Sequence, residues 1–272
     1  MRKIEKLYKG RRSKVGAGVK LTRVFSFYDA ERLDPFLLLD FFDSKNPDEY
    51  KRGLPWHPHR GMETITYLIH GRIDHGDSLG NNGIIEPLGC QWMTAGRGVL
   101  HQEMPQKTPW ILGCQLWLNL PKSKKLTKPV YREITEKDLA IYEDDQVHIK
   151  VISGAFRRIK GPIRGRNMAL TYFDVTVFPG KTFSWQIEKT KQCFILRIEG
   201  ELSIAGEIFE TRGALLTMEE EIRIEAQLGG RFFLIAAEPL KEPVAWQGSI
   251  VMNTQKEVEE AYHDLEEGTF TR

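Results

Sequence analysis

Two short motifs carry residue types that bind metal ions in proteins. His57 and His59 form an H-x-H pair, and His101 and Glu103 form an H-x-E pair. Residues two positions apart in a β-strand point to the same face of the sheet. Each pair therefore presents two ligand side chains on one face if it lies in a strand. Two neighbouring strands of a barrel would then bring three imidazoles and one carboxylate together.

This ligand set limits the metal and its chemistry. Three neutral imidazoles and one carboxylate leave one or two positions for water or substrate on a five- or six-coordinate ion. Iron(II) is the favoured cofactor, and copper, nickel, manganese, cobalt or zinc are the alternatives. No thiolate lies in the motifs, which argues against copper(I) and against a structural zinc site. An isolated H-x-H pair is more often a pair of ordinary strand residues, so the prediction depends on both motifs together.

Short β-rich segments separated by Gly, Pro and Asn supply the strands that would position these motifs. This rhythm runs from Arg23 to Glu238 and is typical of an all-β sandwich or barrel. The Asn- and Gly-containing run 79–84 predicts a hairpin turn. The clearest predicted strands are residues 64–69, 111–119, 148–153, 169–177, 193–199 and 232–237.

Helical patterns are confined to two segments. Residues 134–140 predict one or two turns, with Thr135 as the N-cap. In the tail, Thr254 and Glu257 form a capping box. Apolar residues follow at positions 258, 261, 262 and 265, and Gly268 ends the pattern. We expect this tail helix to pack on the body of the protein.

The chain divides into two β-rich halves, and a short Ile-x-Gly sequence recurs in both, which indicates a duplicated barrel. Five of the seven histidines fall in the stretch 57–101, whereas none lies between His148 and His263. We therefore predict an N-terminal metal-binding domain over residues 1–133. Residues 134–272 would form a metal-free domain together with the tail helix.

The two motifs extend into longer segments that resemble the pirin family. The resemblance runs from about residue 23 to residue 270. The matching segments are PWHPHRGMETITYL (55–68), DSLGN (77–81), QWMTAGRG (91–98), HQEMP (101–105), LWLNLP (116–121) and MNT (252–254). The resemblance implies an all-β bicupin, in which two cupin barrels follow each other along the chain. It also implies one metal ion, usually iron, in the N-terminal barrel and none in the C-terminal barrel.

The resemblance also assigns roles to individual residues. His57, His59, His101 and Glu103 are the implied metal ligands, and they are the same four residues that strand parity selects. Glu63 stands where many other cupins have their fourth ligand. We expect it to accept a hydrogen bond from an imidazole N–H group, and direct ligation is the alternative.

Some pirins resemble quercetin 2,3-dioxygenases, which implies a flavonol-like aromatic substrate and O2. In that chemistry the flavonol chelates the metal through neighbouring oxygens. Glu103 would act as the catalytic base for the 3-hydroxyl proton, because a carboxylate beside a cation is ionised at neutral pH. O2 then attacks, the ring opens and carbon monoxide leaves.

Two other functions remain open at this point. Other pirins imply a redox- or metal-dependent regulator that binds a protein partner, either a transcription factor or a metabolic enzyme. Basic clusters within 9–14 and 157–166 could form such a surface, although solvated loop charges are the simpler interpretation. A vestigial metal site is the third possibility. The fold alone does not distinguish an enzyme, a regulator and a vestigial metal site, because one fold hosts many activities.

Amino-acid composition excludes several classes of protein. The 272 residues contain 39 Lys or Arg and 37 Asp or Glu, a formal charge of +2, which argues against a nucleic-acid coat protein. No sequence-specific DNA reader is recognisable, and the aliphatic runs are too short to span a membrane. Three cysteines without a C-x-x-C pair fit a reducing compartment. We expect a cytoplasmic monomer, which would also be nuclear in a eukaryote.

Overall fold

The computed structural model describes residues 1–163 and 167–272, so Arg164 and Arg166 of the second basic cluster lie outside the described residues. The described chain consists mainly of antiparallel strands and carries one α-helix, α1 (Gln255–Glu266). It forms two compact units, one of residues 1–10 and 138–239 and the other of residues 11–137 and 240–272. The predicted all-β class is confirmed. None of the described helices has the length and apolar character needed to cross a membrane.

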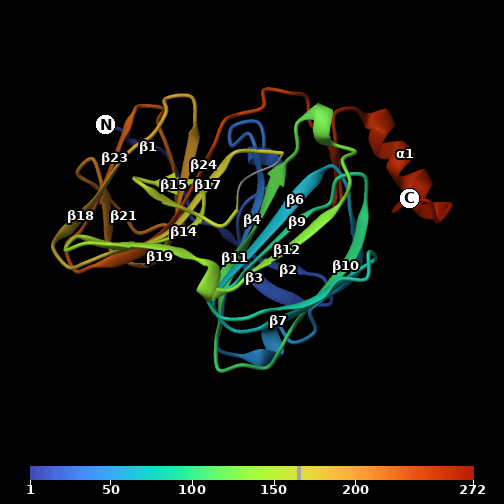
Figure 1. Cartoon of the computed structure of the whole chain (residues 1–272), viewed down its shortest axis with the longest axis horizontal. Coiled ribbons are helices and arrows are strands. Elements are labelled where there is room, and N and C mark those ends of the chain that lie inside the picture. The colour runs from blue at the N-terminus through green and yellow to red at the C-terminus, as the bar shows by residue number, and fades with distance from the viewer. Residues whose placement is uncertain (164–166) are drawn as a thin grey trace. The chain divides into compact units, whose positions relative to one another are not determined.

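The unit of residues 11–137 and 240–272 carries both histidine motifs. Its described strands form a seven-stranded sheet in the order β12-β9-β6-β11-β4-β3-β2 and a four-stranded sheet in the order β5-β10-β7-β8. Figure 1 labels the first sheet at β6, β9 and β11 and the second at β7 and β10. The strands are β2 (Arg11–Val15), β3 (Val19–Phe25), β4 (Phe36–Ser44), β5 (Leu54–His59), β6 (Met62–His70), β7 (Ile73–Asp77), β8 (Asn82–Ile85), β9 (Cys90–Thr94), β10 (Val99–Pro105), β11 (Ile111–Asn119) and β12 (Val130–Ile134).

The local sequence explains two features of these sheets. Strand β10 alternates between buried and half-buried side chains, so His101 and Glu103 point to the same buried face. The predicted hairpin is confirmed, since β7 and β8 pair antiparallel across the turn. Gly80 in that turn has φ = 86°, a conformation that glycine adopts without strain.

The C-terminal segment belongs to the same unit. A small two-stranded sheet of β25 (Ala245–Gln247) and β26 (Ile250–Met252) precedes α1. The predicted capping box is confirmed, because Thr254 and Glu257 exchange side-chain and backbone hydrogen bonds. Buried Val258 and Ala261 pack with β26 in one apolar cluster that also includes Leu100 of β10. Figure 1 shows this helix in red near the C-terminus.

The second unit repeats the arrangement. Its described strands form a seven-stranded sheet, β1-β22-β19-β24-β17-β14-β13, and a four-stranded sheet, β18-β23-β20-β21, and β15 pairs with β16. The strands are β1 (Ile4–Tyr8), β13 (Ala140–Glu143), β14 (Val147–Ser153), β15 (Ala155–Phe156), β16 (Ile159–Lys160), β17 (Leu170–Val177), β18 (Lys181–Gln186), β19 (Gln192–Gly200), β20 (Leu202–Ile204), β21 (Glu207–Phe209), β22 (Gly213–Leu216), β23 (Glu221–Ala226) and β24 (Gly230–Ala237). The matching sheet sizes and strand orders bear out the predicted duplication of a barrel.

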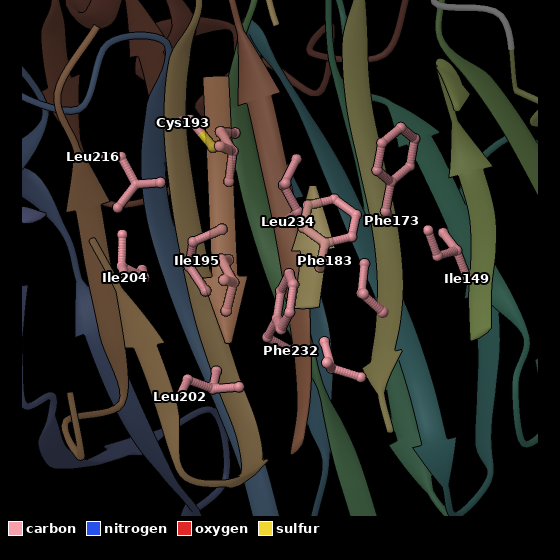
Figure 2. Close-up of a cluster of buried hydrophobic side chains, with 14 of the residues drawn as sticks. Ile149, Phe173, Phe183, Cys193, Ile195, Leu202, Ile204, Leu216, Phe232 and Leu234 are labelled. Atoms are coloured by element: carbon pink, nitrogen blue, oxygen red, sulfur yellow. The ribbon is translucent and has the colours of Figure 1, made fainter. Parts of the chain in front are cut away.

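Apolar side chains fill the interior of this second unit. Figure 2 shows part of the cluster, with Phe173, Phe183 and Phe232 among the labelled residues. Strand β23 stands at the position that β10 has in the other unit. Its buried residues are Ile222, Ile224 and Ala226, whereas the buried face of β10 carries His101 and Glu103.

The elements match the sequence-based predictions closely, with one difference. All six predicted strands are present, each with bounds within two residues. The segment 134–140 holds one three-residue 3-10 turn, Glu136–Asp138, in agreement with the predicted one or two turns. The compact units place the chain ends differently from the predicted domains 1–133 and 134–272. Strand β1 pairs with β22, and α1 packs on β25 and β26.

Candidate metal centre

Strands β5 and β10 bring three histidines together. The strands are antiparallel neighbours, and His101 lies directly opposite His57. Ring nitrogens of His57, His59 and His101 all lie within 4.8 Å of one another. The ring centroids are 4.4 Å apart for His57 and His101, and 4.9 Å apart for each of the other two pairs. Two imidazole nitrogens on opposite sides of one ion would be roughly 4.2 Å apart, twice the usual metal–nitrogen distance. One ion could therefore contact all three rings after small side-chain movements.

The hydrogen bonds of these rings leave nitrogens available for a metal. His57 Nδ1 lies 2.8 Å from the carbonyl oxygen of Pro55, and His101 Nδ1 lies 3.2 Å from His75 Nε2. His101 Nε2 and both ring nitrogens of His59 are buried and make no hydrogen bond of normal geometry with the described residues. A buried polar atom without a partner costs about 1–3 kcal/mol. Coordination of an ion would satisfy these atoms, so the donor set fits a metal.

Burial keeps the rings in the neutral form that binds metal. It lowers the pKa of His59 and of His101 well below the usual 6.5, and the charge of His57 acts on both in the same direction. A backbone group of Ser249 raises the pKa of His59 more weakly. Metal binding requires the unprotonated imidazole, so this environment favours the metal over the proton at neutral pH.

Glu103, the fourth expected ligand, has a different set of contacts. Within the described residues, the close group contains the three histidines and not Glu103. Gln115 Nε2 donates to both carboxylate oxygens at 2.8 Å, and Thr66 Oγ1 donates to one of them at 3.2 Å. Burial raises the pKa of Glu103, while His57 and the two hydrogen-bond donors act in the opposite direction. The carboxyl group is thus held in the barrel interior by two residues of the opposite sheet.

Glu63 lies on β6 and is also buried. Trp92 Nε1 donates to one carboxylate oxygen at 2.9 Å, and Thr94 Oγ1 donates to the other at 2.7 Å. These two partners are an indole and a hydroxyl group. A role for Glu63 toward the metal remains a prediction.

His75 belongs to neither histidine motif, and it lies outside the close group. It nevertheless contacts that group, because its Nε2 is hydrogen-bonded to His101 Nδ1. Its ring stacks on Tyr131 at 4.8 Å, with the two planes only 15° apart. Burial lowers the pKa of His75 to about 4. The alternation Ile73, His75, Asp77 along β7 is the signal that could have placed this ring inside.

Arg60 connects the histidine motif to the end of the chain. It follows His59 directly and is 7% exposed. Its guanidinium donates to the Asp264 carboxylate at 2.7 Å and to the Phe270 carbonyl oxygen at 2.9 Å, and it lies over the Phe270 ring. The backbone beside a candidate ligand is therefore tied to α1 and the residues after it.

Comparisons with known proteins agree with this architecture. Residues 18–118 match the model of the Pirin family, and residues 172–271 match the Pirin C-terminal cupin domain. The chain is 38% identical to a pirin-like protein of Caulobacter vibrioides, covering 99% of both chains. It is also 38% identical to human pirin, covering 92% of this chain and 87% of the relative.

A solved structure extends the similarity to three dimensions. A crystal structure of quercetin 2,3-dioxygenase from Acinetobacter baumannii superimposes with a TM-score of 0.89 at 31% sequence identity, over 99% of this chain and 98% of that one. Together with the two family matches, the duplicated barrels and the histidine cluster in the first of them, this similarity assigns the fold. The chain belongs to the pirin family and has its bicupin fold.

Proposed function

We propose that the protein is a mononuclear metal oxygenase of the quercetin 2,3-dioxygenase type, with iron(II) as the favoured ion and a flavonol-like substrate. The observation that supports it most directly is the convergence of three imidazoles. Among their nitrogens, His101 Nε2 and both nitrogens of His59 are buried without a hydrogen-bond partner of normal geometry among the described residues. The similarity to the Acinetobacter dioxygenase structure supports the choice of substrate class.

In this proposal His57, His59 and His101 hold the ion, and Glu103 completes the set. A divalent ion bound there would acidify a coordinated hydroxyl group and bring the organic substrate and O2 into contact. Glu103 then accepts the 3-hydroxyl proton of the flavonol. Gln115 and Thr66 fix the orientation of its carboxylate through their hydrogen bonds. A carboxylate beside a divalent cation is ionised at neutral pH, so Glu103 can accept this proton.

The test is O2 uptake that depends on quercetin. Protein reconstituted without oxygen with iron(II), and separately with copper, nickel, manganese or cobalt, is compared with a His101→Ala variant, and metal content is measured on each sample. We expect turnover that requires the ion and disappears in the variant. Full metal occupancy without O2 uptake for any ion would exclude the flavonol reaction.

A second candidate is a metal-dependent regulator that binds a protein partner. The contacts of Arg60 favour it, because they couple the residue beside His59 to the C-terminal segment. A change at the metal would then reach the surface through α1. This candidate requires partner affinity that changes with the oxidation state of the ion, measured by titration of the oxidised and reduced protein.

A further inference from the structure

Glu103 also forms one wall of a small cavity in the same unit. The cavity has a volume of about 20 Å³. A water-sized molecule needs roughly 10–15 Å³, so there is room for one small guest. Protein interiors contain few voids of this size because they are packed as densely as organic crystals. Most of its wall is apolar and comes from β3, β4, β5, β7 and β11, through Val19, Phe42, Leu54, Ile73 and Ile111.

The cavity lies close to the candidate metal centre along two strands. Leu54 of its wall is opposite Glu103 in the pairing of β5 with β10, and it precedes His57 on the same strand. Glu103 itself lies two residues from His101 on the same buried face of β10. A molecule in the cavity would therefore contact the side chain that neighbours His101 on this face.

The polar groups in the wall are all engaged elsewhere. Tyr50 donates its hydroxyl hydrogen to the Thr108 carbonyl oxygen at 2.7 Å, and Lys20 is paired with Glu49 at 3.2 Å. The carboxylate of Glu103 already accepts hydrogen bonds from two donors. A buried water normally makes about three hydrogen bonds, whereas apolar cavities stay dry and bind apolar guests such as xenon.

We propose that this cavity is a binding site for a small apolar gas molecule and that its natural occupant is dioxygen, held beside Glu103 before reaction. The identification of the occupant as dioxygen rests on the proposed dioxygenase function. The apolar character of the site is independent of that function. Dioxygen is the one substrate of that reaction that is both apolar and small enough for about 20 Å³.

Xenon is the probe for the site itself. Crystals of the protein pressurised with xenon should show an electron-density peak in the cavity. Val19→Leu, which adds one methylene group to the wall, should abolish the peak. The matched control is Val24→Leu, the same change at a buried residue of the same strand that does not line the cavity. Ile111→Val enlarges the cavity and should increase xenon occupancy. An ordered water in its place, or no xenon peak, would overturn the proposal.

Dioxygen is tested with the iron-loaded protein. In Val19→Leu we expect the rate at which O2 oxidises the bound iron(II), followed by its absorption and paramagnetic resonance, to fall about fivefold, and KM for O2 in flavonol turnover to rise by a similar factor. Val24→Leu should change neither. Unchanged oxidation in Val19→Leu despite loss of xenon would refute the role in O2 binding. Absence of flavonol turnover would refute the proposed function alone, since xenon binding and iron oxidation would still be measurable.

Discussion

The contacts of Gln115 lead to a sharp prediction about the stability of the metal-free protein. Gln115→Leu keeps the size of the side chain but removes its hydrogen bonds to Glu103, and it also removes the acceptor of the Trp117 indole N–H at 3.0 Å. A hydrogen bond to a charged group contributes about 1.5–3 kcal/mol, and Glu103 keeps only the bond from Thr66 in this variant. Since the partly buried Trp117 indole also loses its acceptor, we expect the free energy of unfolding to fall by about 3 kcal/mol.

Gln91 provides a matched control. Gln91, Thr66 and Gln115 are neighbours in register across β9, β6 and β11, and Gln91 is 1% exposed. Neither its amide nitrogen nor its amide oxygen has a hydrogen-bond partner among the described residues. Gln91→Leu removes two unsatisfied polar atoms, so we expect no loss of stability or a gain of about 1 kcal/mol.

Urea unfolding of both variants in the presence of a chelator measures the difference between their free energies of unfolding, provided that the dependence of this free energy on urea concentration is the same in both. A second readout is the pKa of Glu103, followed by NMR of protein with labelled glutamate. Loss of about 1.5–3 kcal/mol of hydrogen bonding to the carboxylate should raise this pKa by roughly one to two units in Gln115→Leu. Equal stability changes in the two variants, with no shift in that pKa, would refute the reasoning.

Three further predictions concern other parts of the molecule. Burial lowers the pKa of His59, and it lowers the pKa of His75 to about 4. The free energy of unfolding of the metal-free protein should therefore decrease as the pH falls from 6.5 towards 4, by about 2 kcal/mol for His75 alone, and a free energy of unfolding that does not change over this range would contradict the prediction. Arg60→Met should lower the free energy of unfolding by about 2–3 kcal/mol and speed amide hydrogen exchange in α1, because it breaks the contact with Asp264. Unchanged exchange would show that packing alone holds the helix. Burial raises the pKa of the Cys193 thiol to about 12, so a maleimide should label it at pH 8 only after unfolding, and rapid labelling of the native protein would count against its burial.

Local pattern accounts for most of the fold and part of the candidate site. Strand parity predicted that His57 and His59 would share a face. The convergence with His101 required in addition that the two strands be neighbours, and β5 and β10 meet this condition. It could not predict the partners of Glu103, because Gln115 lies on the opposite sheet and the contact depends on how the two sheets pack. The contact of His75 with His101 was not predicted for a related reason. It depends on the register in which β7 pairs with β10, and no local sequence pattern determines that register.

The two compact units are each built from two separate stretches of the chain, and this has a consequence for folding during synthesis. The strand order of the unit around 138–239 includes β1, which is synthesised before the other described strands of that unit. Strand β1 must wait until residue 216 has been made before it can pair fully with β22. The unit with the histidine cluster receives residues 240–272 last, including the bond from the Val251 amide to the Arg60 carbonyl. A nascent chain that stops before residue 240 would thus carry every histidine of the cluster in an incomplete unit. If the proposed ion binds, its loading would then be a late event, after the final segment has docked.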